Sequence, residues 1–462
     1  MLSAVALTVL VAACADNTGP SPSARQAPLA PSVNFAQSGT PSGQWLVQTK
    51  TFGSTASVEQ TIRSMGGTVT RSMPQIGIVM ASGLTGPQAV QQLPAANSNV
   101  QVVSADRTLQ WVPTVQSLGV SPAGATDVTA SGTNQSGAAF FNFYQWGMKV
   151  ISAPAAWAAT TGGAGKMVCV LDTGVDPGQL DLNGKVNTGV SVSMSSDSSF
   201  PGNQTIFDYN LHGTFVSSII SSNGIGVASV APDAQLCAVK VLGVTGSGSF
   251  DDVIAGIYYA ASIHAAVINM SLGAYFDQHN GGNSLVVAMQ KAVDYANQQG
   301  TVVVAASGNN GVNLDADGSD VVSLPAQLKG VISVGATGPI NQVGFDQLAS
   351  YSNYGGVTGV ALVAPGGSGN PVVGQDEIIG ACSRYNVTFN CTAGNNYLLG
   401  SGTSFASPHV AGAAAVITAR YPGIRTTTVR RCLTQEADNV GSSAIFGAGR
   451  LNVLNSATLC NP

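Results

Sequence analysis

A serine near the end of the chain lies where a nucleophile could work. Residues 402–412 read Gly-Thr-Ser-Phe-Ala-Ser-Pro-His-Val-Ala-Gly, so Ser404 follows a small, flexible approach and opens an apolar helical segment. The unpaired N–H groups at a helix start favour developing negative charge. Ser404 is therefore placed where an attacking hydroxyl that makes an oxyanion would be stabilised, although a serine that only caps a helix occupies the same position.

A catalytic serine needs a base to take its proton, and the chain has only 4 histidines. His212 lies between a polar loop and an apolar helical segment, which can hold an imidazole at a helix start. His409 is on the same predicted helix as Ser404, five residues on, and should point elsewhere. His264 lies in an Ala-rich helical run, and His279 in a polar, Gly-rich loop. His212 is therefore the candidate base.

Two apolar runs predict buried strands that end in polar residues. One runs to Leu171 and is followed by Asp172, and the other, residues 301–306, leads to Asn309. Strands that are buried on both faces are typical of parallel sheets, whose carboxyl ends carry the sites of α/β folds. Asp172 could orient His212 or cap a turn. The amide of Asn309 could donate to an oxyanion or cap a turn.

Four motifs around these residues resemble signatures of the subtilisin-like serine proteases, the subtilase family (peptidase S8). They are residues 170–176, 212–214, 306–309 and 402–409, in that family's chain order of Asp, His and Ser. The match covers roughly residues 140–458. The resemblance implies no cofactor for catalysis. It implies Asp172 as orienter, His212 as general base and acid, Ser404 as nucleophile and Asn309 as oxyanion donor.

Further segments resemble parts of the family that bind substrate. The backbone of residues 269–273 would pair with an extended peptide, which gives affinity without much sequence selectivity. One departure is Phe215, where many members carry a second histidine, and it concerns local packing rather than activity. The implied substrate-binding residues are Ser271, Leu272, Gly273, Ala306, Ser307 and Gly308.

The resemblance also suggests a structural calcium ion (Ca2+). Asp181 and the loop 223–227 are similar to a family site built from carboxylate, amide and carbonyl oxygens, although this loop looks shorter. Residues 315–320 are a second oxygen-rich candidate or a solvated turn. The implied ligands are Asp181, Asn223, Ile225 and Val227.

Composition limits the kinds of partner. Only 8% of the 462 residues are charged, the net charge is −5, and no Lys/Arg cluster occurs, which argues against nucleic acid. Glycine is plentiful, with 56 residues, which suits a loop-rich extracellular enzyme. We expect a monomer that acts on protein or peptide substrates.

The first residues predict export. Residues 2–13 are small or apolar, too short to span a bilayer but suited to a signal peptide. Val11-Ala12-Ala13-Cys14 also resembles a bacterial lipobox, in which Cys14 carries a lipid anchor. The first basic residue is Arg25, so either the start of the chain is misassigned or the signal is atypical. We therefore expect a protein that is secreted, or anchored by lipid at the bacterial cell envelope.

We expect five parts along the chain: a signal segment (1–14), a disordered linker (15–44), a small domain (45–112), a linker with a processing site (113–139) and a catalytic domain (140–462). The small domain has the β-α-β-β-α-β rhythm of an α+β ferredoxin-like module. It resembles the inhibitory, chaperone-like propeptide of subtilases, and an unrelated small domain is the alternative.

The catalytic domain should be an α/β fold with a doubly wound parallel sheet. The predicted strands lie near 167–171, 235–241, 266–270, 301–305 and 331–334, and the helices near 212–221, 251–264, 284–299 and 404–420.

Six cysteines remain besides Cys14. We predict the disulfides Cys382–Cys391 and Cys432–Cys460. Cys169 and Cys237 lie on apolar strands, and paired parallel strands seldom offer disulfide geometry, so we expect two free thiols. No Cys/His spacing suggests zinc.

Together these features predict a secreted serine endopeptidase that acts through an acyl-enzyme and is made as a self-processing zymogen. Its activity should fall as His212 becomes protonated below neutral pH. One alternative keeps the fold for a dedicated processing or transpeptidase enzyme. Another is a non-catalytic peptide-binding surface lipoprotein.

Overall fold

The computed structural model describes residues 39–113, 121–122, 134–277, 283–316, 321–370, 373–389, 391 and 397–462. Several sequence-based predictions fall outside the described residues. These are the signal segment with Cys14, linker residues 15–38, residues 114–120 and 123–133 of the processing linker, His279, and Asp317–Asp320.

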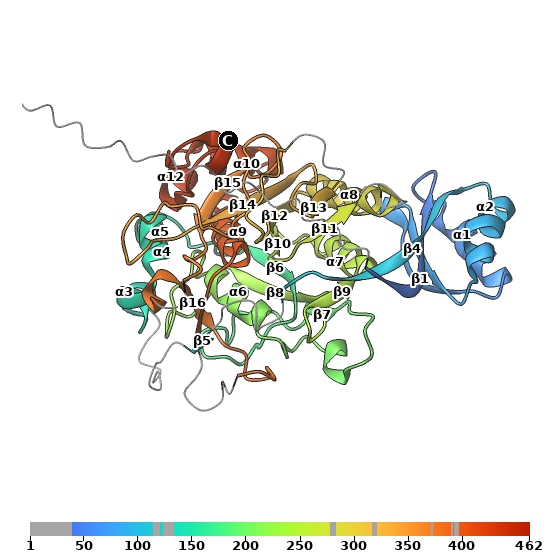
Figure 1. The fold of residues 1–462 in the computed structure, drawn as a ribbon, viewed down its shortest axis with the longest axis horizontal. Helices are drawn as coiled ribbons and strands as arrows, with labels where there is room; N and C mark the ends of the chain where they lie inside the picture. Colours follow the sequence, from blue (N-terminus) through green and yellow to red (C-terminus); the bar gives the residue numbers. More distant parts are fainter. Residues whose placement is uncertain are drawn as a thin grey trace, which may run out of the picture. The chain divides into compact units, whose positions relative to one another are not determined.

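A parallel sheet of seven strands forms the centre of the catalytic part (Figure 1), in the order β15-β14-β12-β10-β6-β8-β7. It confirms the predicted doubly wound α/β sheet, and all five predicted strands are present. The strands are β6 (Met167–Asp172), β7 (Val192–Ser193), β8 (Gln235–Lys240), β10 (Val267–Met270), β12 (Val302–Ala306), β14 (Val331–Thr337) and β15 (Leu362–Pro365).

Alternate residues of each strand pack against helices on opposite faces of this sheet. In β6, Val168 and Val170 join a cluster with residues of α6 and α9, whereas Cys169 and Leu171 join one with residues of α7 and α8. This is why the strand is apolar throughout. The four helices match the predicted ones, and they are α6 (His212–Ile220), α7 (Phe250–Ser262), α8 (Asn283–Gln298) and α9 (Thr403–Arg420).

Shorter elements complete the catalytic part. β11 (Ala274–Asp277) pairs with β13 (Val321–Leu324), and β16 (Ile378–Ala381), β17 (Tyr397–Gly400) and β5 (Ser121–Pro122) form a small antiparallel sheet. The remaining helices are α3 (Phe141–Tyr144), α4 (Trp146–Val150), α5 (Ala153–Ala159), α10 (Thr426–Gln435), α11 (Ser443–Phe446) and α12 (Val453–Thr458). None of the described helices is long and apolar enough to cross a membrane.

Residues 39–113, called the N-terminal domain below, have the predicted β-α-β-β-α-β order. Their strands form an antiparallel sheet in the order β2-β3-β1-β4, and β9 (Ser247–Ser249) of the catalytic part adds to the β4 edge. The elements are β1 (Thr40–Thr49), α1 (Thr55–Ser64), β2 (Thr68–Met73), β3 (Ile78–Ser82), α2 (Leu93–Ala96) and β4 (Val100–Gln110).

The start of this domain differs from the prediction. Residues 40–44, assigned to the disordered linker, form the first part of β1. Thr40 pairs with Thr108 and Pro41 with Arg107, and the register shifts before Trp45. Pairing with β4, which is distant in sequence, therefore makes residues 40–44 part of β1, although their composition indicates a linker.

The structure contains three disulfides among its described cysteines. Cys382–Cys391 and Cys432–Cys460 are as predicted. The prediction of free thiols at Cys169 and Cys237 is wrong, because the structure joins these two residues as well. They lie directly opposite one another in β6 and β8, with Cα atoms 4.3 Å apart, so the register brings both sulfurs to the same face.

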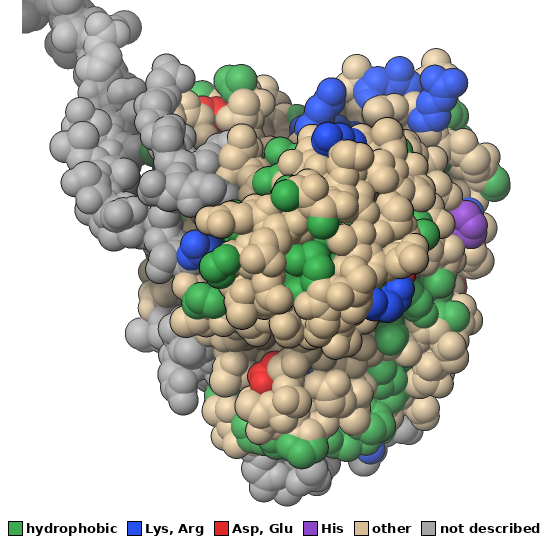
Figure 2. Space-filling view, turned by 90° about the vertical axis from the view of Figure 1, so that its right-hand side faces the viewer, with side chains coloured by type: hydrophobic (Ala, Val, Ile, Leu, Met, Phe, Trp, Pro, Cys, Tyr) green, Lys and Arg blue, Asp and Glu red, His purple; other side chains and the backbone are tan. Residues whose placement is uncertain are grey.

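The surface carries few charges. Figure 2 shows one face on which few acidic and basic side chains lie among apolar side chains and other uncharged groups, with several of the basic ones at the upper edge. This agrees with the low charged fraction of 8% in the sequence.

Candidate active site

Asp172 and His212 form a buried pair at the carboxyl end of the central sheet. Asp172 ends β6 and His212 begins α6, and both side chains are fully buried. His212 Nδ1 lies 2.8 Å from Asp172 Oδ1 and 3.0 Å from Oδ2. The other ring nitrogen, Nε2, has no hydrogen-bond partner among the described residues. The carboxylate thus orients the ring and leaves Nε2 as the nitrogen that can act as a base.

Ser404 lies in the first turn of α9 and is only 4% exposed. Its Oγ donates a hydrogen bond to the carbonyl oxygen of Ser271, at 3.0 Å, and not to His212. Within the described residues, the structure therefore joins His212 to Asp172 by hydrogen bonds but does not join Ser404 to His212.

Asn309 is held beside Ser404 by a threonine. Its Oδ1 accepts hydrogen bonds from the Thr403 backbone N–H (2.8 Å) and the Thr403 hydroxyl (2.7 Å). With Oδ1 fixed in this way, the Nδ2 amide is the group that can donate into the cavity. Thr403 belongs to the motif around Ser404, but the sequence did not indicate that Thr403 holds the Asn309 side chain.

A cavity lies between Ser404, Asn309 and the predicted substrate segments. His212 and Asp172 do not belong to its described lining. Leu272, Gly273, Ala306 and Gly308, which were predicted to bind substrate, line this cavity. Ser271 and Ser307 do not belong to its described lining. The other described lining residues are Gln110, Trp111, Pro113, Tyr275, Asn309, Asn310, Ser323, Thr403 and Ser404.

Ser271 and Ser307, the two predicted residues outside the lining, bond to segments that carry lining residues. Ser271 Oγ donates to the carbonyl oxygen of Ser404 at 2.7 Å. The Ser307 carbonyl oxygen accepts from Ser323 Oγ and Asn353 Nδ2. Both serines are buried, so they hold the first turn of α9 and the end of β12 in place.

Asp208 is a buried residue of the site that the sequence analysis missed. Its carboxylate accepts hydrogen bonds from the Thr173 hydroxyl, from the backbone N–H of Leu211, and from the N–H and hydroxyl of Thr214. These contacts fix the loop that presents His212. The sequence carried no capping signal for Asp208, because it lies four positions before His212 and the N-cap position is Leu211.

Lys240 places a buried cation near the same carboxylates. It pairs with Asp172 across β6 and β8, and its Nζ donates to the carbonyl oxygens of Thr173 and Phe207. Burial lowers the pKa of Lys240 to about 8, although the nearby Asp208 and Asp172 oppose this shift. The positive charge of Lys240 offsets part of the free-energy cost of burying the carboxylates of Asp172 and Asp208.

The predicted calcium site has a different construction. Asp181 Oδ1 accepts from the backbone N–H of Ile225, and Oδ2 accepts from the N–H groups of Gly226 and Val227 and from the Tyr397 hydroxyl. Asn223 Nδ2 donates to backbone carbonyl oxygens at Leu180 and Asn183.

The loop therefore turns N–H donors toward Asp181, where a cation needs oxygen ligands. The residues present do not fit a calcium ion at this place. Within the described part of the chain, no group of three His, Cys, Asp or Glu residues could hold a metal. Asp315 of the second candidate accepts from the backbone N–H groups of Val357, Thr358 and Gly359.

We expect Tyr397→Phe to lower the free energy of unfolding by about 1.5–3 kcal/mol, because the Tyr397 hydroxyl donates to a buried carboxylate. Denaturant unfolding measures the loss. Tyr259→Phe is the matched control, since its hydroxyl donates to a neutral carbonyl oxygen, that of Val190, and its loss should be smaller. Equal losses would contradict the assigned importance of the Asp181 contact.

A parallel α/β sheet with a buried His–Asp pair, a serine at a helix start and a nearby amide donor defines a candidate serine hydrolase.

Comparison with known proteins agrees. Residues 163–449 match the subtilase family (Peptidase_S8). A thermophilic serine proteinase from Bacillus sp. (strain AK1) is 37% identical over 323 residues, covering 69% of this chain and 68% of that protein.

Subtilisin Savinase from Lederbergia lenta is 36% identical over 309 residues, covering 66% of this chain and 96% of that protein. The chain therefore belongs to the subtilase family of serine proteases.

Solved structures agree on the fold. The epidermin leader peptide processing serine protease from Staphylococcus aureus superposes with a TM-score of 0.71 at 23% identity, covering 91% of this chain and 98% of that one. Fervidolysin from Fervidobacterium pennivorans, a keratinolytic enzyme related to subtilisin, gives 0.69 at 25% identity, covering 92% of this chain and 61% of that one.

Proposed function

We propose that the protein is a secreted serine endopeptidase that hydrolyses peptide bonds through an acyl-enzyme and is made as a self-processing zymogen. The buried His212–Asp172 pair carries this proposal, because it leaves His212 Nε2 without a partner among the described residues, and the His212 ring packs against Phe405, the residue after Ser404. Lipid anchoring at Cys14 belongs to the same proposal as an alternative to free secretion.

The chemistry follows from the roles of these groups. Ser404 Oγ attacks the scissile carbonyl carbon while His212 Nε2 takes its proton, and Asp172 stabilises the resulting imidazolium. The oxyanion receives hydrogen bonds from Asn309 Nδ2 and from the Ser404 backbone N–H. His212 then protonates the leaving amine. A water molecule, deprotonated by the same ring, releases the acyl group and restores the serine.

The end of the N-terminal domain occupies the proposed substrate position. The backbone N–H groups of Trp111 and Val112 donate to the Gly246 carbonyl oxygen, each at 3.2 Å. Gly273 N–H donates to the Trp111 carbonyl oxygen at 2.9 Å. This is how an added strand binds to a sheet edge. Trp111 and Pro113 also line the cavity together with Ser404. These contacts support a propeptide that blocks the cavity and precedes the proposed processing linker, residues 113–139.

Asn309→Ala is expected to lower kcat for digestion of an unfolded protein, such as reduced and alkylated casein, by about 10²–10³. This magnitude is that of the corresponding donor in subtilisin, a member of this family. Asn310→Ala is the matched control, because Asn310 also lines the cavity. It should leave kcat within a few-fold of the wild-type value.

The same assay tests the proposed function. A dedicated processing enzyme would leave casein largely intact, and a peptide-binding lipoprotein would not cleave it. Equal activity of the wild type and the Asn309→Ala variant would contradict the assigned oxyanion donor.

A further inference from the structure

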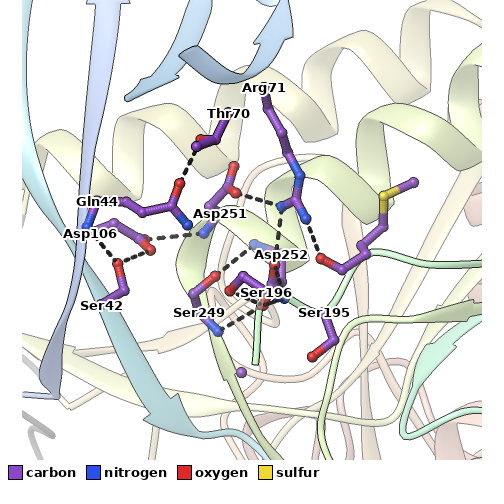
Figure 3. Close-up of polar contacts among 12 residues, drawn as sticks. Ser42, Gln44, Thr70, Arg71, Asp106, Ser195, Ser196, Ser249, Asp251 and Asp252 are labelled. Carbon is purple, nitrogen blue, oxygen red and sulfur yellow. Dashed lines mark hydrogen bonds and ion pairs between the residues drawn. The ribbon is translucent and has the colours of Figure 1, made fainter. Parts of the chain in front are cut away.

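Charged side chains are buried where the N-terminal domain meets the first turn of α7 (Figure 3). Arg71 of β2 donates to Asp251 Oδ2, to Asp252 Oδ1 at 3.0 Å, and to the carbonyl oxygen of Met194. Asp251 and Asp252 are each 1% exposed. The catalytic part thus encloses one guanidinium of the N-terminal domain with two carboxylates and a carbonyl oxygen.

The two aspartates differ in how well they are satisfied. Asp252 forms a capping box with Ser249 and also accepts from the N–H and hydroxyl of Ser196. Asp251 Oδ1 is buried and has no hydrogen-bond partner among the described residues. Arg71 therefore supplies the hydrogen bond that the Asp251 side chain accepts, through Oδ2. A buried carboxylate oxygen without a donor, such as Oδ1, is costly unless it binds a further donor or a proton.

A third carboxyl group lies close by. Asp106 of β4 accepts from the backbone N–H of Asp251 at 3.2 Å and from the Ser42 hydroxyl at 2.7 Å. The charged groups that face Asp251 are thus Arg71 from β2, Asp106 from β4 and Asp252 from its own helix. One guanidinium cannot neutralise three buried carboxylates.

We propose that Asp251, Asp252 and the Met194 carbonyl oxygen form a guanidinium-binding site, by which the catalytic part recognises Arg71 of its own N-terminal domain and releases it as the pH rises. The proposal rests on the proposed function of that domain as an inhibitory propeptide. It adds the chemical group that is recognised and the condition for release.

The direction of the pH effect follows from protonation. Burial raises the pKa of Asp251 to about 8, opposed by Arg71, and raises that of Asp106 to about 6. Undocking exposes both groups to water and returns them toward about 3.9. A carboxyl whose pKa is raised in the docked state stabilises docking at low pH, and this stabilisation is lost as the pH rises through the docked pKa. Docking should therefore weaken as the pH rises from about 4 to about 8. Between about pH 6 and 8 the loss comes from Asp251 alone.

Hydrogen exchange in the full-length Ser404→Ala chain tests this inference, because that variant keeps both parts in one chain. The amides of Trp111, Val112 and Gly273 bond across the contact. After correction for the intrinsic exchange rate, their protection should fall by about tenfold per pH unit between about pH 6 and 8, one proton being released. Adding Asp251→Asn should remove most of this dependence, since the amide does not titrate.

Two arginines provide a matched comparison. Arg71→Met should lower the protection of these amides by at least about tenfold, as expected when a buried charge pair loses one partner. Arg63→Met, which breaks the exposed pair with Glu59 in α1, should leave it unchanged. Equal protection in the two variants, or an undiminished pH dependence in Asp251→Asn, would overturn the proposal.

The outcomes separate this proposal from the function on which it rests. Protected amides in β6 and β8 report that the catalytic part is folded, and Asp106→Asn gives a second, milder variant that should reduce the dependence below pH 7. Failure of the wild-type chain to process itself would contradict the zymogen. If the protection of the Trp111, Val112 and Gly273 amides in the Ser404→Ala chain did not change with pH, only the guanidinium site would be contradicted.

Discussion

The Ser404→Ala variant is expected to retain its full-length mass after folding, whereas the wild-type chain loses its N-terminal part. Alanine has no hydroxyl to attack a carbonyl carbon, and His212 Nε2 then has no proton to accept. In subtilisin, of the same family, loss of the catalytic serine costs about 2 × 10⁶ in kcat, and we expect a loss of similar order. Intact mass measures processing, and hydrolysis of a peptide substrate measures kcat.

Ser262→Ala is the control for this variant. Ser262 is exposed at the end of α7, and its hydroxyl donates only to the Tyr259 carbonyl oxygen, so the variant should process as the wild type does. A Ser404→Ala chain that still shortened, in a preparation free of other proteases, would exclude Ser404 as the nucleophile. Full-length wild type that cleaves the peptide would instead show that the N-terminal domain is no propeptide.

The sequence predicted the main elements of the site because each depends on local pattern. Continuous apolar runs predict strands buried on both faces, and the polar residues that end them must meet at one edge of a parallel sheet. This placed Asp172 at the end of β6 and His212 at the start of α6, where the structure has them. Ser404 was predicted from its place at a helix start and Asn309 from the polar end of a second apolar run.

Features that depend on tertiary contact were not predictable in this way. The Cys169–Cys237 disulfide requires the register of β6 against β8, which a single strand does not encode. At Asp181 the resemblance to a family site suggested a cation, but three backbone N–H groups point toward the carboxylate instead, so the loop holds an anion. The contacts of Arg71 join residues about 180 positions apart, and no local pattern reports them.

Asp172→Asn is expected to lower kcat by about 10⁴, even though the substituted side chain has nearly the same shape. The carboxylate accepts from His212 Nδ1 with both oxygens within 3.0 Å, and it is held in turn by the Thr173 N–H at 2.7 Å. An amide in its place can donate to Nδ1, which favours the tautomer that carries the proton on Nε2. That tautomer cannot take the proton from Ser404, and the imidazolium loses its counter-charge.

The rate constant for self-processing, followed by intact mass over time, measures this loss without a purified mature enzyme. Asp346→Asn is the matched control, because Asp346 is 40% exposed and pairs with Arg450 outside the described cavity lining. It should process at nearly the wild-type rate. Because Asp172 bonds to His212 Nδ1, a loss of about 10⁴-fold at Asp172 with none at Asp346 would support a carboxylate that acts through the His212 ring. Similar rates for the Asp172→Asn variant and the wild type would mean that the buried pair is structural and that another group activates Ser404.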